Sequence, residues 1–531
     1  MSFFAANPTM PVTRRASLVN HPQSGVVVTA FVLPSHLYQA DSVGILSMKR
    51  LLPALLLLAT ALGAPAAPAA SSTASRPNIV FIFADDWGWG DLSSHGSTWL
   101  RTPHLDGLAA AGIDFGQFNV LNPVCSPSRT AVMTGQYPAR WGVHQHFAHP
   151  AQNRQRDMPD WLDPRATTLP GLLRAAGYRT GHFGKWHLTN RQTPGAPRPE
   201  AYGIDEWAVF NGGAGWPAAK VGDTAANTVA FIRAHRDRPF FINVWLHESH
   251  TPHAPSAEAM ERWKHLDEQR RVYAAVITDG DAAVGRILDA LREAGVENNT
   301  LVIFSSDNGP ENTGRVKRPA YTEGDSGVTG YDTYYSVGET GGLRGRKRHL
   351  FEGGVRVPFI VRWPDRAPAG IKNDTTVITA VDLLPTLCAA AGVALPAGYR
   401  GDGENLLPAL TGRSVARTKP VFWEWRGGQA EPDGWPRLAV RDGDWKLLLT
   451  HDAKRVSLHR LTVDRAEARD ESAAQPDVVA RLSRLALEWK ASLPTRPPEE
   501  CFAPADQITP PPAEKKSAPR KAKAAGAANQ P

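Results

Sequence analysis

The residues best suited to chemistry in this chain form two short polar groups, each directly after an apolar, strand-like run. Asp85 and Asp86 end the first run, and Asp307 and Asn308 end the second. Ligands of open α/β sheets bind beyond the carboxyl ends of the strands, so these side chains could meet at one sheet edge. Three carboxylates so close would repel one another unless a cation lay among them. Oxygen donors alone predict a hard divalent cation, Ca²⁺ or Mg²⁺.

Each of these groups also has a purely structural interpretation. A pair of aspartates after a strand can cap a helix, and Asp-Asn-Gly can form a hairpin turn. The metal interpretation therefore depends on the two groups occurring together.

A second candidate is the sequence CSPSR, from Cys125 to Arg129, which TAVMTG follows. The other cysteines are Cys388 and Cys501. Three widely spaced cysteines allow one disulfide at most, so a disulfide framework is excluded. The structural alternative is a buried cysteine at the start of a helix, with Arg129 as a surface charge.

Three further motifs contain potential catalytic groups. GKWHL supplies Lys185 and His187, ESHTPHAP supplies His250, and GLRGRKRHLFEGG places Lys347 five residues before Glu352. Taken alone, GKWH could be a packed strand end, and GRKRH a solvated basic run or a polyanion-binding patch.

The order of these motifs resembles that of the type I sulfatases. DD, CxPxR, GKWH, HTP, DNG and K-x₄-EGG follow one another between Asn78 and Pro364, and AVRDGDWKLL extends the resemblance into the C-terminal part. The resemblance implies an alkaline-phosphatase-like α/β fold. It also implies that a formylglycine-generating maturation enzyme oxidises Cys125 to Cα-formylglycine (3-oxoalanine) during export. A hydrated aldehyde offers hydroxyl oxygens, which suit a hard cation better than a thiolate does.

The resemblance further implies a role for each residue of the site. The metal, Ca²⁺ rather than Mg²⁺, would be bound by Asp85, Asp86, Asp307, Asn308 and the modified Cys125. One hydroxyl of the hydrated aldehyde would attack sulfur, His250 would protonate the leaving alcohol, and His187 would act as the base that restores the aldehyde. Positive charge on Arg129, Lys185 and Lys347 would offset the charge of the sulfuryl oxygens.

The implied activity is that of a sulfuric ester hydrolase, acting on sulfated carbohydrates and on aryl sulfates. One alternative is a phosphonate or phosphodiester hydrolase of the same superfamily. A non-catalytic glycan-binding relative would lack a catalytic residue, yet every expected position is filled. Specificity should come from loops over the strand ends. The candidates are Gly142 to Pro150 and Gly314 to Gly342, whose four tyrosines could stack on a sugar, namely Tyr321, Tyr331, Tyr334 and Tyr335.

The elements that must position these residues alternate between strand and helix. Apolar runs at 79–84, 239–247, 299–309 and 357–364 predict strands buried on both faces. The run 281–295 has the spacing of an amphipathic helix, with Gly295 as its stop. This alternation predicts an α/β domain with a mainly parallel central sheet flanked by helices.

The pattern changes near Thr411, and the two ends of the chain differ again. We expect a catalytic domain over 76–410 and a small antiparallel-sheet subdomain with a closing helix over 411–502. A disordered basic tail should occupy 503–531. Residues 48–70 read as a signal peptide, with Met48 as the real start and 1–47 as a non-native extension.

Export to the periplasm or the medium follows from the signal peptide. Its apolar segment is too short to span a membrane, and no cysteine near the cleavage zone offers a lipid anchor. The net charge of +7 lies mostly in residues 1–70 and in the tail, about +3 in each. The body is therefore nearly neutral, which argues against nucleic acid as a partner.

Overall fold

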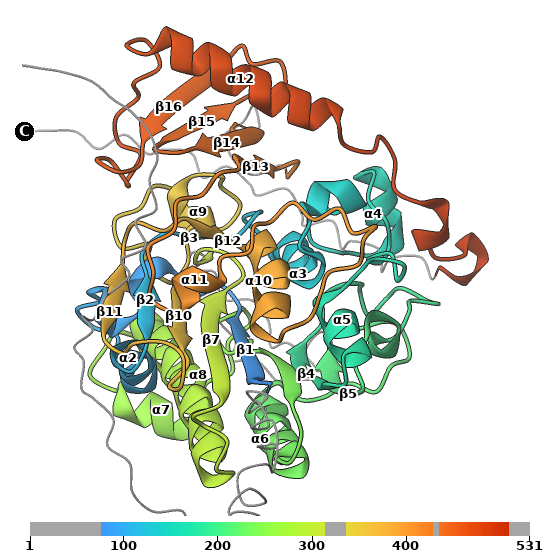
Figure 1. The fold of residues 1–531 in the computed structure, drawn as a ribbon, viewed down its shortest axis with the longest axis vertical. Helices are drawn as coiled ribbons and strands as arrows, with labels where there is room; N and C mark the ends of the chain where they lie inside the picture. The colour runs from blue at the N-terminus through green and yellow to red at the C-terminus, as the bar shows by residue number, and fades with distance from the viewer. Residues whose placement is uncertain (1–75, 314–335, 428–434, 509–531) are drawn as a thin grey trace, which may run out of the picture. The chain divides into compact units, whose positions relative to one another are not determined.

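The fold was analysed in a computed structural model that describes residues 76–313, 336–427 and 435–508. Its centre is an eight-stranded sheet in the order β11-β2-β10-β7-β1-β6-β4-β5 (Figure 1). The parallel and antiparallel pairings leave only β10 running opposite to the other seven strands. The strands are β1 (Asn78–Ala84), β2 (Ile113–Phe115), β4 (Arg179–Lys185), β5 (Glu206–Phe210), β6 (Phe240–Trp245), β7 (Thr300–Ser306), β10 (Phe359–Arg362) and β11 (Ile371–Asn373).

The position of β1 inside the sheet explains why its sequence is continuously apolar rather than alternating. Ile79 and Phe81 face one hydrophobic core, and Val80 and Ile82 face another on the opposite side of the sheet. Both faces are covered, so every position of the strand is buried. The predicted α/β class with a mainly parallel sheet is confirmed.

Helices cover the two faces of the sheet. The longest, α8, begins at Glu268, so the helix predicted from residue 281 is one part of a 26-residue element. The helices of the α/β part are α2 (Pro103–Ala110), α3 (Cys125–Thr134), α4 (Pro150–Gln155), α5 (Leu169–Ala175), α6 (Thr224–His235), α7 (Ala257–Arg262), α8 (Glu268–Glu293), α9 (Glu352–Val355), α10 (Leu383–Ala390) and α11 (Leu407–Leu410). Two small sheets pair β3 (Phe118–Asn119) with β12 (Ile378–Thr379) and β8 (Asn312–Thr313) with β9 (Ser336–Val337).

A separate four-stranded antiparallel sheet follows the α/β part, as predicted. A two-residue turn joins its second and third strands, because Asp442 pairs with Trp445 and Gly443 has a φ of 58°. The closing helix packs on this sheet, with Trp489 stacked on Phe422 at 5.1 Å between ring centroids. The elements are β13 (Val421–Glu424), β14 (Leu438–Asp442), β15 (Trp445–Leu449), β16 (Val456–Arg460) and α12 (Pro476–Ala491).

Four buried charged residues join this sheet to the α/β part, and we call them the junction cluster. Lys446 of β15 places its Nζ 2.8 Å from Glu352 Oε1 and 3.0 Å from Glu467 Oε1. Arg356 bonds the other oxygen of Glu352 at 2.5 Å. Two cations therefore balance two carboxylates where α9 meets the C-terminal sheet.

Several predictions concern residues outside the described part of the chain. These are the extension 1–47, the signal peptide 48–70, the four tyrosines between 314 and 335, and most of the basic tail. Among the helices that are described, none is both long and apolar enough to cross a membrane. Cys125, Cys388 and Cys501 are all buried and unbonded to one another, so the one disulfide that the sequence allowed is not formed.

Candidate active site

The site is built on the adjacent ends of β1 and β7. These strands are parallel neighbours with Ala84 opposite Ser306, so the residues that follow them are brought side by side. The backbone N–H of Asp86 donates to Asp307 Oδ1 at 3.2 Å, and Asn308 Nδ2 donates to Asp86 Oδ1 at 2.7 Å. Asn308 Oδ1 is buried and has no hydrogen-bond partner among the described residues. Three carboxylates and an orphaned amide oxygen are a donor set that fits a calcium ion.

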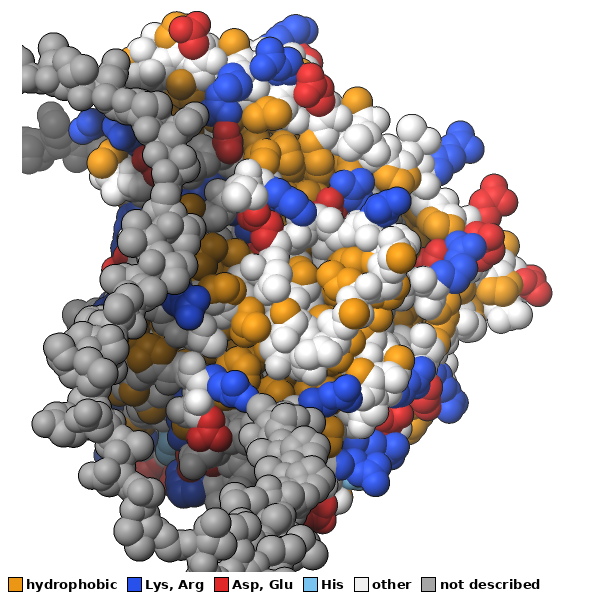
Figure 2. Space-filling model, viewed as in Figure 1, with side chains coloured by type: hydrophobic (Ala, Val, Ile, Leu, Met, Phe, Trp, Pro, Cys, Tyr) orange, Lys and Arg blue, Asp and Glu red, His pale blue; other side chains and the backbone are white. Residues whose placement is uncertain are grey.

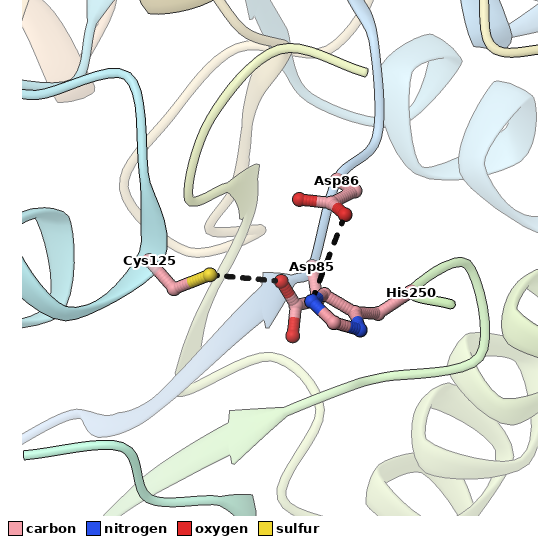
Figure 3. Close-up of side chains that lie close together, drawn as sticks. All are labelled: Asp85, Asp86, Cys125 and His250. Atoms are coloured by element: carbon pink, nitrogen blue, oxygen red, sulfur yellow. Dashed lines mark hydrogen bonds and ion pairs between the residues drawn. The ribbon is translucent and has the colours of Figure 1, made fainter. Parts of the chain in front are cut away.

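Cys125 is the first residue of α3 and lies over this sheet edge. Its Sγ is 3.7 Å from Asp85 Oδ1 and 3.5 Å from Lys185 Nζ. Figure 3 shows Cys125, Asp85, Asp86 and His250 turned toward one another, and their ligand atoms all lie within 4.8 Å. Burial raises the pKa of the Cys125 thiol to about 12, so the side chain is a neutral thiol and a poor ligand for a hard cation.

Three cations surround the carboxylates. Arg129, one turn along α3 from Cys125, bonds Asp307 through Nη2 at 2.6 Å. Lys185, the last residue of β4, lies 2.5 Å from Asp85 Oδ2, and Lys347 lies 2.6 Å from Asp86 Oδ1. Arg129 is fully buried, which contradicts the alternative of a surface charge.

The three carboxylates differ in the direction in which their surroundings shift their pKa values. Burial raises the pKa of Asp85, but Lys185, His250, His247 and Arg129 outweigh it and hold the pKa well below its ordinary value. Burial and the neighbouring Asp85 raise the pKa of Asp307 to about 7. Burial also raises the pKa of Asp86, against the opposing effect of Lys347. A cation among the three carboxylates would relieve this repulsion.

Two predicted histidines lie in the same site with defined hydrogen bonds. His187 Nε2 is 3.1 Å from the carbonyl oxygen of Phe147, and His250 Nδ1 is 2.6 Å from that of Thr251. A carbonyl oxygen only accepts, so these two nitrogens carry the hydrogen. Burial, followed by Lys185, holds the pKa of both imidazoles well below the ordinary value.

These groups open into a cavity of about 390 Å³. Cys125, Lys185, Lys347 and the two histidines line its inner part. The segment Gly142 to Pro150 forms part of the wall, as the sequence suggested, through His146, Phe147, Ala148 and His149. The other suggested segment lies outside the described residues apart from 336–342.

The backbone is strained around this cavity. Asp86, His187, Asn211 and Arg348 have φ values of 64°, 51°, 53° and 72°. Residues other than glycine seldom adopt such values, and each costs about 1–3 kcal/mol. Four such residues around one site indicate that these side chains are placed at the cost of unfavourable backbone conformations.

The sequence did not single out His247 or Glu311. His247 follows β6, donates through Nδ1 to Asp85 Oδ2 at 2.7 Å, and stacks on His250 with ring centroids 4.5 Å apart. Glu311 lies four residues after Asp307 and bonds Arg348 Nη1 at 2.6 Å. The HxxH spacing of His247 and His250 at a strand end was a usable signal for the first. No sequence signal marked Glu311, because its partners come from a distant loop.

A buried cluster of carboxylates and cations at the end of a parallel sheet, beside a cavity lined by cations, is suited to binding and hydrolysing an anionic ester. The chain belongs to the sulfatase family: the Sulfatase family model matches residues 77–393. A second model, described as N-sulphoglucosamine sulphohydrolase, C-terminal, matches residues 340–487. The protein is accordingly a sulfuric ester hydrolase.

Named relatives agree with this assignment. The N-acetylgalactosamine-6-sulfatase of Canis lupus familiaris is 32% identical over 413 residues, covering 70% of this chain and 72% of that protein. The arylsulfatase A of Bos taurus is 32% identical over 418 residues, covering 71% and 75%. Among solved structures, Ps i-CgsB in complex with k-i-k-neocarrahexaose matches with a TM-score of 0.66 and 25% identity, covering 82% of this chain and 96% of that one.

Proposed function

We propose that this protein removes sulfate from sulfated carbohydrates, and also from aryl sulfates, with a formylglycine made from Cys125. The observation that carries the proposal is the position of Cys125. Its buried side chain lines the cavity beside the ion pair of Asp85 and Lys185, where a neutral thiol would do little. The family relatives named as an N-acetylgalactosamine-6-sulfatase and an arylsulfatase A support both substrate types.

In this proposal Ca²⁺ is held by Asp85, Asp86, Asp307 and Asn308, together with an oxygen of the modified Cys125. The ion would supply positive charge for the sulfate group and for the ionised nucleophile. The orphaned oxygen of Asn308 and the raised pKa values of Asp86 and Asp307 support a cation at this position. Mg²⁺ suits the site less well, because it prefers to retain several waters in an octahedral shell.

The formylglycine, in its hydrated form, would supply the hydroxyl that attacks sulfur. Arg129, Lys185 and Lys347 would hold charge close to the sulfuryl oxygens from buried positions, where such charges act most strongly. Their positions are fixed before substrate arrives, because each already bonds a buried aspartate.

The two histidines take different proton-transfer roles in this scheme. His187 carries its hydrogen on Nε2, and its Nδ1 is buried without a partner among the described residues. The lowered pKa keeps Nδ1 unprotonated and therefore available to accept a proton, so we assign His187 as the base. His250 carries hydrogen on Nδ1, so Nε2 is the atom that would pass a proton to the leaving alcohol. The negative charge of a bound sulfate would offset Lys185 and Lys347 and favour protonation of this nitrogen.

The proposal also places this enzyme outside the cytoplasm, in the periplasm or the medium. The signal-peptide pattern of residues 48–70 supports export. A formylglycine-generating enzyme would act on Cys125 before the chain folds, since the thiol is buried afterwards.

The test is mass spectrometry of the peptide that contains Cys125, together with assays on matched esters. We expect an aldehyde in place of the thiol, hydrolysis of 4-nitrophenyl sulfate and of a sulfated sugar, and much slower hydrolysis of 4-nitrophenyl phosphate and phosphonate esters. An active enzyme with an unmodified thiol would refute the formylglycine. A preference for the phosphorus esters would favour the phosphonate or phosphodiester hydrolase.

A further inference from the structure

The catalytic cavity is lined by charge of one sign. Its described lining includes Lys185, Lys347, Arg191 and Arg348 and several histidines, but no aspartate or glutamate. The site's own carboxylates lie behind these residues. By contrast, on the face of the molecule drawn in Figure 2, Lys and Arg side chains are interspersed with Asp and Glu. A concave site with one sign of charge concentrates anions of the opposite sign.

The four cations differ in burial, and two of them lie farther out than the other two. Lys185 and Lys347 bond Asp85 and Asp86 beside Cys125, so they belong to the inner part that binds the scissile sulfate. Arg191 lies in the loop after β4 and is exposed. The Arg348 side chain is 36% exposed, so its guanidinium lies near the mouth of the cavity.

Arg348 is held in place at a cost to the backbone. Its φ of 72° is a value that glycine adopts easily and arginine does not. This conformation lets its N–H donate to the carbonyl oxygen of Pro123 at 2.9 Å, two residues before Cys125. Glu311 bonds one terminal nitrogen of the guanidinium at 2.6 Å. Both contacts fix the guanidinium relative to the catalytic residue, while its other N–H groups can still bind an anion.

We infer that the substrate carries a second negative charge, a further sulfate or a carboxylate, which Arg191 and Arg348 bind while the scissile sulfate occupies the inner cavity. This inference depends on the proposed function. The cavity volume of about 390 Å³ is in the range of small-molecule sites, which suits one or two sugar units at the end of a chain.

The test measures binding rather than turnover. Calcium-loaded Cys125→Ala protein is titrated calorimetrically with N-acetylgalactosamine 4-sulfate, its 6-sulfate and its 4,6-disulfate. A fourth ligand, the disaccharide of glucuronic acid and N-acetylgalactosamine 6-sulfate, separates a carboxylate from a second sulfate as the source of the charge. We expect at least one doubly charged ligand to bind roughly tenfold or more tightly than both monosulfates, as expected for a charge-assisted hydrogen bond.

Two variants assign this gain to the arginines. Arg348→Gly keeps the backbone conformation and removes the guanidinium, and Arg191→Gln removes the other charge. Each should abolish most of the tenfold preference while changing the affinity for the monosulfates by less than about threefold. Arg344→Gln is the matched control, since Arg344 lies in the same segment, does not line the cavity and donates to the carbonyl oxygen of Glu467. It should leave the preference intact.

Equal affinities for singly and doubly charged ligands would overturn the inference. So would absence of binding by all four sugars, or an equal weakening of every ligand by the two variants. Failure of the proposed function gives a different result, because the unsubstituted enzyme would then not hydrolyse 4-nitrophenyl sulfate.

Discussion

Two groups of fully buried charges in this protein use similar residues for different purposes. In the junction cluster, one lysine lies between two carboxylates, and no residue of the cluster lines the catalytic cavity. In the active site, three carboxylates crowd together at one sheet edge, cations face a cavity, and four nearby residues have strained backbones. The comparison teaches that buried charge alone does not identify a catalytic site. Like-charge crowding and backbone strain do not do so either, because Glu467 of the junction cluster is repelled by Glu352 and has a φ of 54°. The active site differs in adjoining a cavity that Cys125 and its cations line.

The largest expected effect is on Cys125. Cys125→Ala should abolish turnover, because the nucleophile is lost, while the melting temperature stays close to that of the unsubstituted protein. Cys125→Ser should take up at most one sulfate per chain, since it lacks the second hydroxyl that releases the product. Activity assays and intact-protein mass spectrometry check both. Full turnover by the alanine variant would show that Cys125 is not the catalytic residue. The cluster around it would then have no demonstrated function that the junction cluster lacks.

His250 should show a loss that depends on the leaving group. Its removal leaves an alkoxide without a proton, so His250→Ala should lower kcat/KM for a sugar sulfate by about 10²–10⁴ and for 4-nitrophenyl sulfate by clearly less. His459→Gln is the control. His459 is also a buried histidine, but it lies on β16 opposite Lys446 of β15, in the C-terminal sheet. An equal loss on both substrates would make His250 a binding residue instead of an acid.

A matched pair of lysine substitutions tests the comparison directly. Lys446→Met leaves two buried carboxylates without their shared cation, which should cost about 3–5 kcal/mol of unfolding free energy. Its kcat on the folded fraction should stay within about twofold, since no catalytic residue is touched. Lys347→Met should reduce activity severely, yet its melting temperature should recover in calcium, because the ion replaces the lost charge beside Asp86.

Denaturant unfolding with and without calcium measures both variants. Calcium should not rescue Lys446→Met beyond its effect on the unsubstituted protein. Equal rescue of the two variants would show that the clusters are not functionally distinct.

Asp307→Asn should separate metal binding from stability. Loss of one carboxylate weakens calcium retention and activity, but it also removes repulsion from Asp85. The loss of the 2.6 Å ion pair with the buried Arg129 outweighs this relief, so in EDTA the variant should melt lower than the unsubstituted protein. With calcium at 100 times its dissociation constant, only the unsubstituted protein should gain about 2.7 kcal/mol. Elemental analysis that finds stoichiometric zinc, and no calcium or magnesium, would refute the ion assignment.

The smallest effect concerns pH and the junction cluster. Burial raises the pKa of Glu467 to about 7, with Glu352 adding repulsion and Lys446 opposing both. The folded protein then holds a proton that the unfolded chain releases near its ordinary pKa of 4.5. This contribution to stability is present below pH 4.5 and is lost as the pH rises toward 7. Glu467→Gln should remove that decline, as thermal melts from pH 5 to 8 would show. An unchanged pH profile would contradict the raised pKa.

Much of the fold could be predicted because its signals are local. Continuous apolar runs marked β1, β6 and β7. Two predictions needed tertiary context. The first half of α8 lacks a distinct sequence signal, so the predicted helix began 13 residues too late. The reversed direction of β10 could not be read from its residues, because a strand buried on both faces has the same composition in either direction.

What the sequence determined by itself is the set of chemical groups and their order along the chain. Asp85, Cys125, Lys185, His250, Asp307 and Lys347 could be selected from motifs, because their types and spacing carry the chemistry. Only the tertiary structure decided which groups share one environment. It placed His247 against Asp85, gave Arg348 its position at the cavity mouth through Glu311, and turned Glu352 away into the junction cluster. These contacts join residues far apart in the chain, and their energies depend on burial and distance, which no local pattern encodes.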